Sequence, residues 1–324
     1  MTLNRRHFVQ VAAAAGLAAP RLARAETYPA RAVRMIVPFL PGGPTDLFAR
    51  LIAPKLSEQM GAQFYIENVG GAGGNIGAGR AAQAAPDGYT LLVDGANLMV
   101  NPALYSSLPY DPFKSFDPVI MAVTSQVILA THPSFPPHTI KELVDLVRAN
   151  PNKYSYASPG TGTPPQLVAE LFRLTLNLDL VHVPYKGGGE AIASTLANQT
   201  PMSFGALAPA VPLVQSGALR GLAVASKTRS RVLPDVPTMA EAGFPEIEGE
   251  SWFAVVAPAG TPKEIITALN REIARAVAAP DVQQRLGVLG YEAVATSTED
   301  CATRFRGEAD KWTKVIHASG IKSD

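Results

Sequence analysis

Short runs of apolar and β-branched residues alternate along the chain with longer segments in which apolar residues recur at helical spacing. The short runs predict β-strands at 33–39, 64–66, 91–93, 154–157 and 180–183. The clearest helical segment is 264–278, where Ile265, Leu269, Ile273 and Val277 share one face. This alternation of strands and helices predicts an α/β architecture with mainly parallel sheets.

Capping boxes mark three expected helix starts, because a threonine is followed there by Glu or Gln at the third position beyond it. They begin at Thr139, Thr163 and Thr261. Pro164 and Pro262 stand at the favoured first helical position after two of these threonines. The pattern predicts that a helix begins after each threonine.

The N-terminus has the layout of an export signal. Arg5-Arg6 precedes an apolar run at 9–19, and Ala23-Arg24-Ala25 offers a cleavage site between small residues. We therefore predict a signal peptide at 1–25, and either the general secretory or the twin-arginine route fits it. No later run reaches the roughly 18 apolar residues of a spanning helix. The mature chain is expected to start at Glu26 and to be periplasmic, without membrane insertion.

Charge and cysteine content narrow the function. The chain has 28 basic and 27 acidic residues, and removal of the four arginines of the predicted leader leaves 24 against 27, a net charge of −3. This balance disfavours nucleic acid as a partner.

Cys301 is the sole cysteine, so an intramolecular disulfide is excluded. It has no histidine near it in sequence, so a catalytic thiol is not expected. The five histidines lack metal-ligand spacing, and no catalytic or metal site is predicted.

Three glycine-rich turns lie between predicted strands and helices, at 41–46, 70–75 and 158–163. The first N–H groups of a helix lack internal partners and the helix dipole is positive there, so such turns can hold a carboxylate without a lysine or an arginine. An alternative interpretation is that the glycines only permit tight turns. Three such turns in one chain favour a ligand cleft at the carboxyl ends of the strands.

Motifs spread over most of the chain resemble the receptors of tripartite tricarboxylate transporters, the Bug or TctC-like family. The resemblance extends from about Val33 to Gly320. Its motifs, in order, are PGG at 41–43 with Asp46, GAGG at 71–74, DGYTL at 87–91, NPxLY at 101–105, VPYKG at 183–187, LPDVPT at 233–238, Trp252 and APAGTP at 257–262. Each motif is weak by itself, whereas their order along the chain is specific.

The resemblance implies a type II periplasmic-binding-protein fold, in which two α/β lobes joined by two crossovers enclose a ligand cleft. Lobe 1 would comprise 26–124 and 252–324 and lobe 2 would comprise 125–251, with crossovers near Thr124 and Ser251. It also implies a monomeric receptor, without enzymatic activity or a cofactor, for a small organic carboxylate, with a di- or aromatic carboxylate as candidates. Its partners would be the membrane subunits of a transporter or a signalling protein.

The family pattern further implies which residues hold the carboxylate, through backbone amides and bridging waters. One wall would be Phe39, Leu40, Pro41, Gly42, Gly43, Thr45 and Asp46. The facing wall would be Ser158, Gly160, Thr161, Gly162, Thr163 and Gln166. The remainder would be lined by Asn97, Tyr185, Phe204, Gly205 and Ala206.

Two departures from the family pattern bear on the ligand. Gln166 stands where histidine is common, and Gly205-Ala206 stands where Asp-Asn is common. An amino-acid ligand needs a carboxylate partner for its ammonium group, and without that Asp only Asp46 or Asp94 is left for the task. A simple organic or aromatic acid is therefore favoured. Asp46 keeps two interpretations, a ligand-orienting residue or a carboxylate in the first turn of a helix.

The alternative from another functional class is an exported dinucleotide-dependent oxidoreductase. The sequence G-x-G-x-x-A at 77–82 follows the predicted strand at 64–66, and Asp94 ends the next strand, which approximates a nucleotide fingerprint. The segment between strand and motif is longer than the usual tight turn, and the helix must end by Pro86. Binding of NAD would distinguish the two functions.

Overall fold

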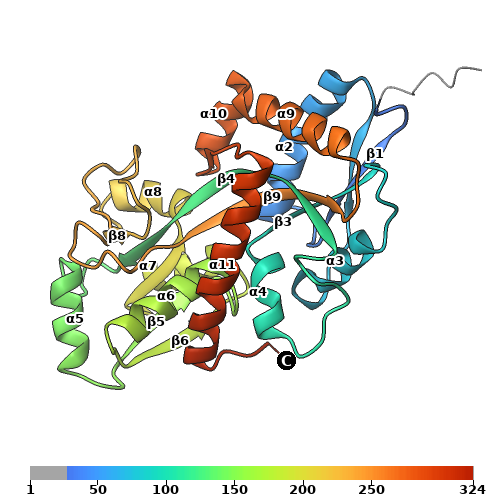
Figure 1. Ribbon diagram of the computed structural model, residues 1–324. Helices are drawn as coiled ribbons and strands as arrows, with labels where there is room; N and C mark the ends of the chain where they lie inside the picture. Colours follow the sequence, from blue (N-terminus) through green and yellow to red (C-terminus); the bar gives the residue numbers. More distant parts are fainter. Residues whose placement is uncertain (1–27, 324) are drawn as a thin grey trace, which may run out of the picture.

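The computed structural model describes residues 28–323, and the predicted signal peptide lies outside them. Figure 1 shows two α/β bodies side by side, with the long strand β4 (Phe116–Thr131) running from one into the other. The five strands predicted from the sequence are confirmed as β1 (Val33–Val37), β2 (Phe64–Asn68), β3 (Thr90–Gly95), β5 (Tyr154–Ser158) and β6 (Leu180–Pro184).

In the first body, β1 lies between β2 and β3 and is parallel to both. Successive side chains of a strand point to opposite faces, so each face of this sheet has a core of its own. Met35 faces α2 (Pro44–Met60) and α9 (Lys263–Ala278), whereas Ile36 shares a core with α3 (Asn75–Ala82). Both faces of the sheet are thus covered by helices.

The second body repeats this arrangement around β5. Strand β7 (Met202–Ala206) is parallel to β5, and β5 is parallel to β6. The other elements of this body are α5 (Ile140–Arg148), α6 (Pro164–Thr175), α7 (Gly188–Leu196), α8 (Leu207–Gln215) and β8 (Arg220–Val224).

The two bodies are connected by β4 and β9 (Glu250–Pro258), which pair with each other in antiparallel fashion. Strand β4 pairs with β9 as far as Gln126 and with β7 from Val127 onward. Because β4 and β9 run antiparallel to the strands beside them, the pairing is mixed, and the expectation of mainly parallel sheets is wrong. The predicted crossovers near Thr124 and Ser251 lie in the β4–β9 ladder, and the lobe boundaries stay a prediction.

The C-terminal helix α11 (Thr298–Ser319) packs on both bodies, as Figure 1 shows. Phe305 belongs to a core of the first body and Trp312 to the core of the second. Between them, the carboxylate of Glu308 accepts hydrogen bonds of 2.9 Å from the indole N–H groups of both Trp252 and Trp312. The remaining elements are η1 (Ala72–Gly74), α4 (Asn97–Leu104), α10 (Pro280–Val288) and β10 (Glu292–Ala293).

The three predicted helix starts have different outcomes. At α5 the capping box is confirmed, because Thr139 Oγ1 accepts a hydrogen bond of 3.1 Å from the N–H of Glu142. Helix α6 begins at Pro164 as predicted. Near Thr261 a helix does begin, one residue later than predicted, as α9 at Lys263. The capping box there is wrong, because the Thr261 hydroxyl instead donates to the carbonyl of Pro258 at the end of β9.

Cys301 is fully buried in α11. Burial raises the pKa of its thiol to about 12. A nucleophilic cysteine needs its thiolate form, which is scarce here at neutral pH. This side chain therefore serves packing.

Candidate functional site

The second and third glycine-rich turns contact the end of α4, and the first turn contacts the second. A Cβ atom at Gly70 would lie 3.5 Å from Leu40 Cδ2, which puts the first and second turns in contact. A Cβ atom at Gly73 would collide with the hydroxyl of Tyr105, and one at Gly162 would lie 2.7 Å from Leu104 Cδ1. Since Leu104 and Tyr105 are neighbours at the end of α4, the fold gathers turns that are far apart in sequence.

Asp46 holds the first turn. Its Oδ2 accepts hydrogen bonds of 2.8 Å from the Gly42 N–H and from Arg50 Nε, and its Oδ1 accepts one of 2.9 Å from Asn68 Nδ2. Burial raises the pKa of Asp46, but the bonds from Arg50, Gly42 and Asn68 outweigh burial and hold the pKa below its usual value. The carboxylate thus stays ionised and accepts three hydrogen bonds from within the protein, which favours a structural role.

The third turn is held in the same manner by Gln166, whose Oε1 accepts a hydrogen bond of 2.7 Å from the Gly162 N–H. The Thr163 hydroxyl donates to the carbonyl of Gly160 at 2.7 Å and does not cap α6. Gly162 has φ of +76° and faces Leu104 closely, so a side chain there would be both strained and crowded. Both side chains of the predicted capping box therefore shape the turn.

The starts of α2 and α6 expose N–H groups that lack partners. Pro44 and Pro164 occupy the first helical positions, and no side chain among residues 28–323 caps either helix. Within the same residues, the N–H groups of Thr45, Asp46 and Gln166 have no acceptor, although these residues are almost completely buried. A buried N–H without an acceptor is costly. A carboxylate oxygen would supply the missing acceptor.

Sequence reasoning missed His182, whose Nε2 lies 2.7 Å from Ser158 Oγ behind the third turn. Its imidazole stacks on the ring of Tyr156, with centroids 5.0 Å apart. Register explains the encounter, since β5 and β6 are parallel and Tyr156 pairs with His182. Along the sequence the five histidines show neither metal-ligand spacing nor a nucleophile–base arrangement, and the pairing of two neighbouring predicted strands is the signal that could have revealed His182.

The other predicted lining residues have diverse surroundings. Tyr185 donates its N–H to the carbonyl of Ser158 and its hydroxyl to Ser194 Oγ at 2.6 Å, so the hydroxyl is already engaged in the second body. Asn97 is the first residue of α4 and is half-buried. Phe204 is fully buried between Tyr156 and Phe172, where it packs the core.

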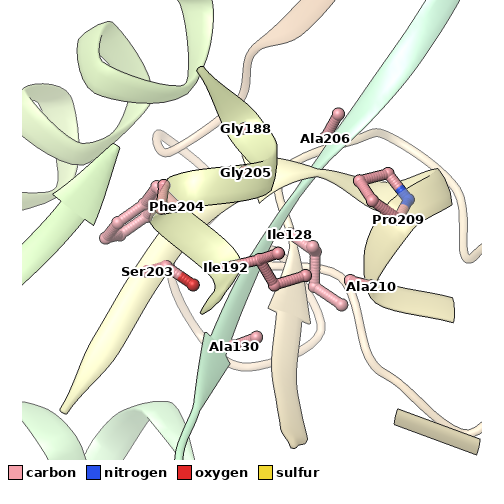
Figure 2. A pocket seen from close by; sticks show the side chains of 11 residues that line it. Ile128, Ala130, Gly188, Ile192, Ser203, Phe204, Gly205, Ala206, Pro209 and Ala210 are labelled. Atoms are coloured by element: carbon pink, nitrogen blue, oxygen red, sulfur yellow. The ribbon is translucent and has the colours of Figure 1, made fainter. Parts of the chain in front are cut away.

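Gly205 and Ala206 line a small cavity between α7 and α8 together with Phe204, as Figure 2 shows. Ile128, Ile192 and Ala210 give the cavity a mainly apolar wall. Its volume is only about 10 Å³, which is the space that a single water needs. It has no room for an organic acid.

A larger groove of about 750 Å³ lies on the outer side of the first body, between α2 and α10. Leu47, Leu51 and Val288 provide apolar lining, and Arg50 and Arg285 provide positive charge. None of the predicted site residues lines this groove. Arg50 nevertheless connects it to the first turn through its bond with Asp46.

Asp94 was the other candidate partner for a ligand ammonium. It is buried in β3, and its Oδ1 accepts a hydrogen bond of 2.7 Å from the N–H of Gly95. Burial raises the pKa of Asp94 to about 7, which exceeds the opposing effect of that hydrogen bond. The raised pKa favours the protonated form of this carboxyl group, which makes it a weak anchor for a cation.

The glycines on which the oxidoreductase alternative depended do not form a phosphate-binding turn. Gly77 and Gly79 lie inside α3, not in a phosphate-binding turn before it. A Cβ atom at Gly77 would lie 2.6 Å from the carbonyl oxygen of Val69, and one at Gly79 would lie 2.6 Å from Pro109 Cγ. These glycines allow α3 to pack closely. Across residues 28–323, no group of three or more His, Cys, Asp or Glu residues could hold a metal ion.

Comparison with known proteins gives consistent matches over nearly the whole chain. The family described as "Tripartite tricarboxylate transporter family receptor" matches residues 48–321. BugT of Bordetella pertussis is 36% identical over 312 residues, which are 96% of this chain and 95% of BugT.

Two solved proteins of Rhodopseudomonas palustris have the same fold. One, solved with adipate, is 34% identical with a TM-score of 0.79, over 91% of this chain and 99% of the other. MatC with bound malate is 34% identical with a TM-score of 0.76, over 89% of this chain and all of MatC (100%). The predicted fold, a two-lobed α/β periplasmic binding protein, is confirmed.

Proposed function

The chain belongs to the tripartite tricarboxylate transporter receptor family, and we propose that it binds a small organic dicarboxylate in the periplasm and delivers it to the membrane subunits of such a transporter. One observation carries this proposal above all. The first and third glycine-rich turns present buried N–H groups without acceptors at the starts of α2 and α6. The first turn contacts the second, and the second and third both contact the end of α4. A carboxylate is the common ligand that satisfies such groups.

The chemistry of the turns supports a dicarboxylate without an ammonium group. Adipate and malate, which two similar solved proteins hold, are both of this kind. In this chain Asp46 already accepts three hydrogen bonds, and the carboxyl group of Asp94 is buried with a raised pKa. Arg50 already balances the charge of Asp46, and Asp94 holds a proton more readily than an ordinary carboxyl group, so neither residue is a strong partner for an ammonium group.

We assign the first wall of the site to Phe39–Asp46 and the second to Ser158–Gln166, with lobe 1 at 26–124 and 252–324 and lobe 2 at 125–251. Support comes from β4, which exchanges β9 for β7 as its partner directly after Gln126. A carboxylate between the walls would be withdrawn from water when the lobes approach each other about the β4–β9 ladder.

The proposed location follows from the family and from the leader-like residues 1–25, which lie outside the described residues. Across residues 28–323, none of the helices combines the length and the apolar character that crossing a membrane requires. Intact-mass measurement on a periplasmic fraction should give a chain that starts at Glu26. A full-length chain in the cytoplasm would contradict this location.

A thermal-shift screen tests the ligand class directly. We expect adipate or malate to stabilise the protein, by about 2.7 kcal/mol at about 100 times Kd, while NAD and amino acids do not. The dimethyl esters provide a control of similar size without the charges. Stabilisation by an ester equal to that by its acid, or no stabilisation by any carboxylate, would contradict the proposed function.

A further inference from the structure

His182 lies on β6, next to β5, and Ser158 at the end of β5 begins the third glycine-rich turn. Nε2 of His182 is 2.7 Å from Ser158 Oγ. Ser158 Oγ also accepts a hydrogen bond of 3.2 Å from the Gly160 N–H and donates one of 3.4 Å to the Gly160 carbonyl. The hydroxyl is fully buried. A chain of contacts thus runs from the imidazole, through Ser158, to both backbone groups of Gly160.

A hydroxyl has one proton and two acceptor positions, and the Gly160 N–H uses one of these positions. Ser158 Oγ can therefore keep its 2.7 Å contact with Nε2 of His182 in two ways. It donates to an Nε2 that has no proton, or it accepts from a protonated Nε2 while its own proton points to the Gly160 carbonyl.

This arrangement allows His182 to become charged without a change in the turn. The charged ring carries a proton on both nitrogens, so Nε2 donates to Ser158 Oγ and the hydroxyl proton points to the Gly160 carbonyl. Because Ser158 and Gly160 belong to the anion-binding turn, the imidazolium would place a positive charge close to a bound carboxylate.

The surroundings of His182 keep it neutral while the site is empty. Burial lowers the pKa of His182, and the carboxylate of Glu170 on α6 opposes this only in part. Glu170 is itself engaged, because it accepts a hydrogen bond of 2.5 Å from the Tyr156 hydroxyl and pairs with Arg173 at 2.8 Å. From β5, the Tyr156 ring and the Ser158 hydroxyl face the imidazole.

We propose that His182 is a positioning residue of the anion-binding turn and that its protonation strengthens the binding of a carboxylate. This inference rests on the proposed function. A bound anion favours the charged imidazole, so binding should take up protons from solution. The pKa of His182 is then higher in the complex than in the free protein. Affinity is greatest at low pH and falls as pH rises through the pKa of the complex.

Calorimetric titration with adipate and malate tests this, because both probes are mostly ionised between about pH 6 and about pH 8. We expect wild type to bind about threefold to tenfold more tightly at the lower pH and to take up protons, as heats in buffers of different ionisation enthalpy report. H182Q, whose amide can still donate to Ser158 but does not titrate, should show less than about a twofold change.

H132Q is the matched control, because His132 pairs with Ser134 at 2.7 Å beyond the C-terminal end of β4, away from the turn. It should retain the pH dependence of wild type. If H182Q retains it too, the inference is wrong. As a readout that needs no variant to fold, imidazole NMR of wild type should show the pKa of His182 rising on addition of adipate, and an unchanged pKa overturns the inference.

The outcomes separate this inference from the proposed function. Binding of adipate or malate by wild type with equal affinity at both pH values overturns the role of His182 and leaves the receptor function intact. Absence of binding by wild type at either pH overturns both.

Discussion

The turns Gly42–Asp46 and Gly162–Gln166 belong to different bodies but are built alike, and their one clear difference concerns charge. Each reads Gly-x-Pro-x-acceptor, with glycine φ values of +84° and +76° and an acceptor side chain that holds the glycine N–H. In the first turn the acceptor is Asp46, and Arg50 follows it one helical turn later. In the third turn the acceptor is the neutral Gln166, and Glu170 follows at the same spacing.

This difference explains why an acid is tolerated in one turn and an amide stands in the other. The negative charge of Asp46 is balanced by Arg50 at 2.8 Å, so the first turn is neutral as a unit. In α6 the residue one turn later is the buried Glu170, which Arg173 balances at 2.8 Å. A carboxylate at 166 would add a second negative charge without a cation of its own, next to the proposed anionic ligand. Turns that are proposed to hold an anion should themselves avoid uncompensated negative charge.

The strongest test of this difference is Q166E. This variant places a carboxylate in the third turn, as Asp46 does in the first, but no arginine follows it as Arg50 follows Asp46. The new oxygen can still accept the Gly162 N–H, so the turn geometry is retained. We expect affinity for adipate or malate to fall about tenfold to a hundredfold and the free energy of unfolding to fall by about 2 kcal/mol, because a buried like charge is added near Glu170. Calorimetric titration and chemical denaturation measure these effects.

The reverse exchange at α5, E142Q, is the control for Q166E. Glu142 occupies the third position of a capping box in the same way, but its surroundings are exposed. E142Q should leave carboxylate binding unchanged. Equal binding by Q166E and wild type would show that charge is not the feature that distinguishes the two turns.

A second test compares Gly42 and Gly162, which both have positive φ values but differ in the atoms around them. A Cβ atom at Gly42 would meet nothing within 4 Å, whereas one at Gly162 would press on Leu104. Both G42A and G162A impose left-handed strain of about 1–2 kcal/mol. We expect G162A to weaken binding about tenfold more than G42A, because the displaced α4 contact moves the turn. G217A, with φ of +74° and open space around it, should cost stability without affecting affinity. Similar affinities for G42A and G162A would contradict this.

The sequence was sufficient for features that depend on local pattern. Apolar runs located all five predicted strands, and the predicted hydrogen bond from the Glu142 N–H to Thr139 Oγ1 is present. The Gly-x-Pro-x-acceptor pattern is also repeated in the sequence, at 42–46 and 162–166. His182 could not be placed without the register of β5 and β6, and the antiparallel run of β4 beside β9 depends on contacts far apart in sequence.

The smallest expected effect distinguishes two threonines that look the same in sequence. Thr139 caps α5, whereas the Thr163 hydroxyl turns away from α6 and holds the Gly160 carbonyl. T139A should therefore lower the free energy of unfolding by about 1 kcal/mol and leave ligand affinity unchanged. T163A loses a neutral hydrogen bond worth about 0.5–1.5 kcal/mol within the binding turn, and affinity should fall about twofold to tenfold. T163S, which keeps the hydroxyl, should restore affinity. If T163A instead lowers the free energy of unfolding and leaves affinity unchanged, as T139A does, both threonine hydroxyls only stabilise the start of a helix.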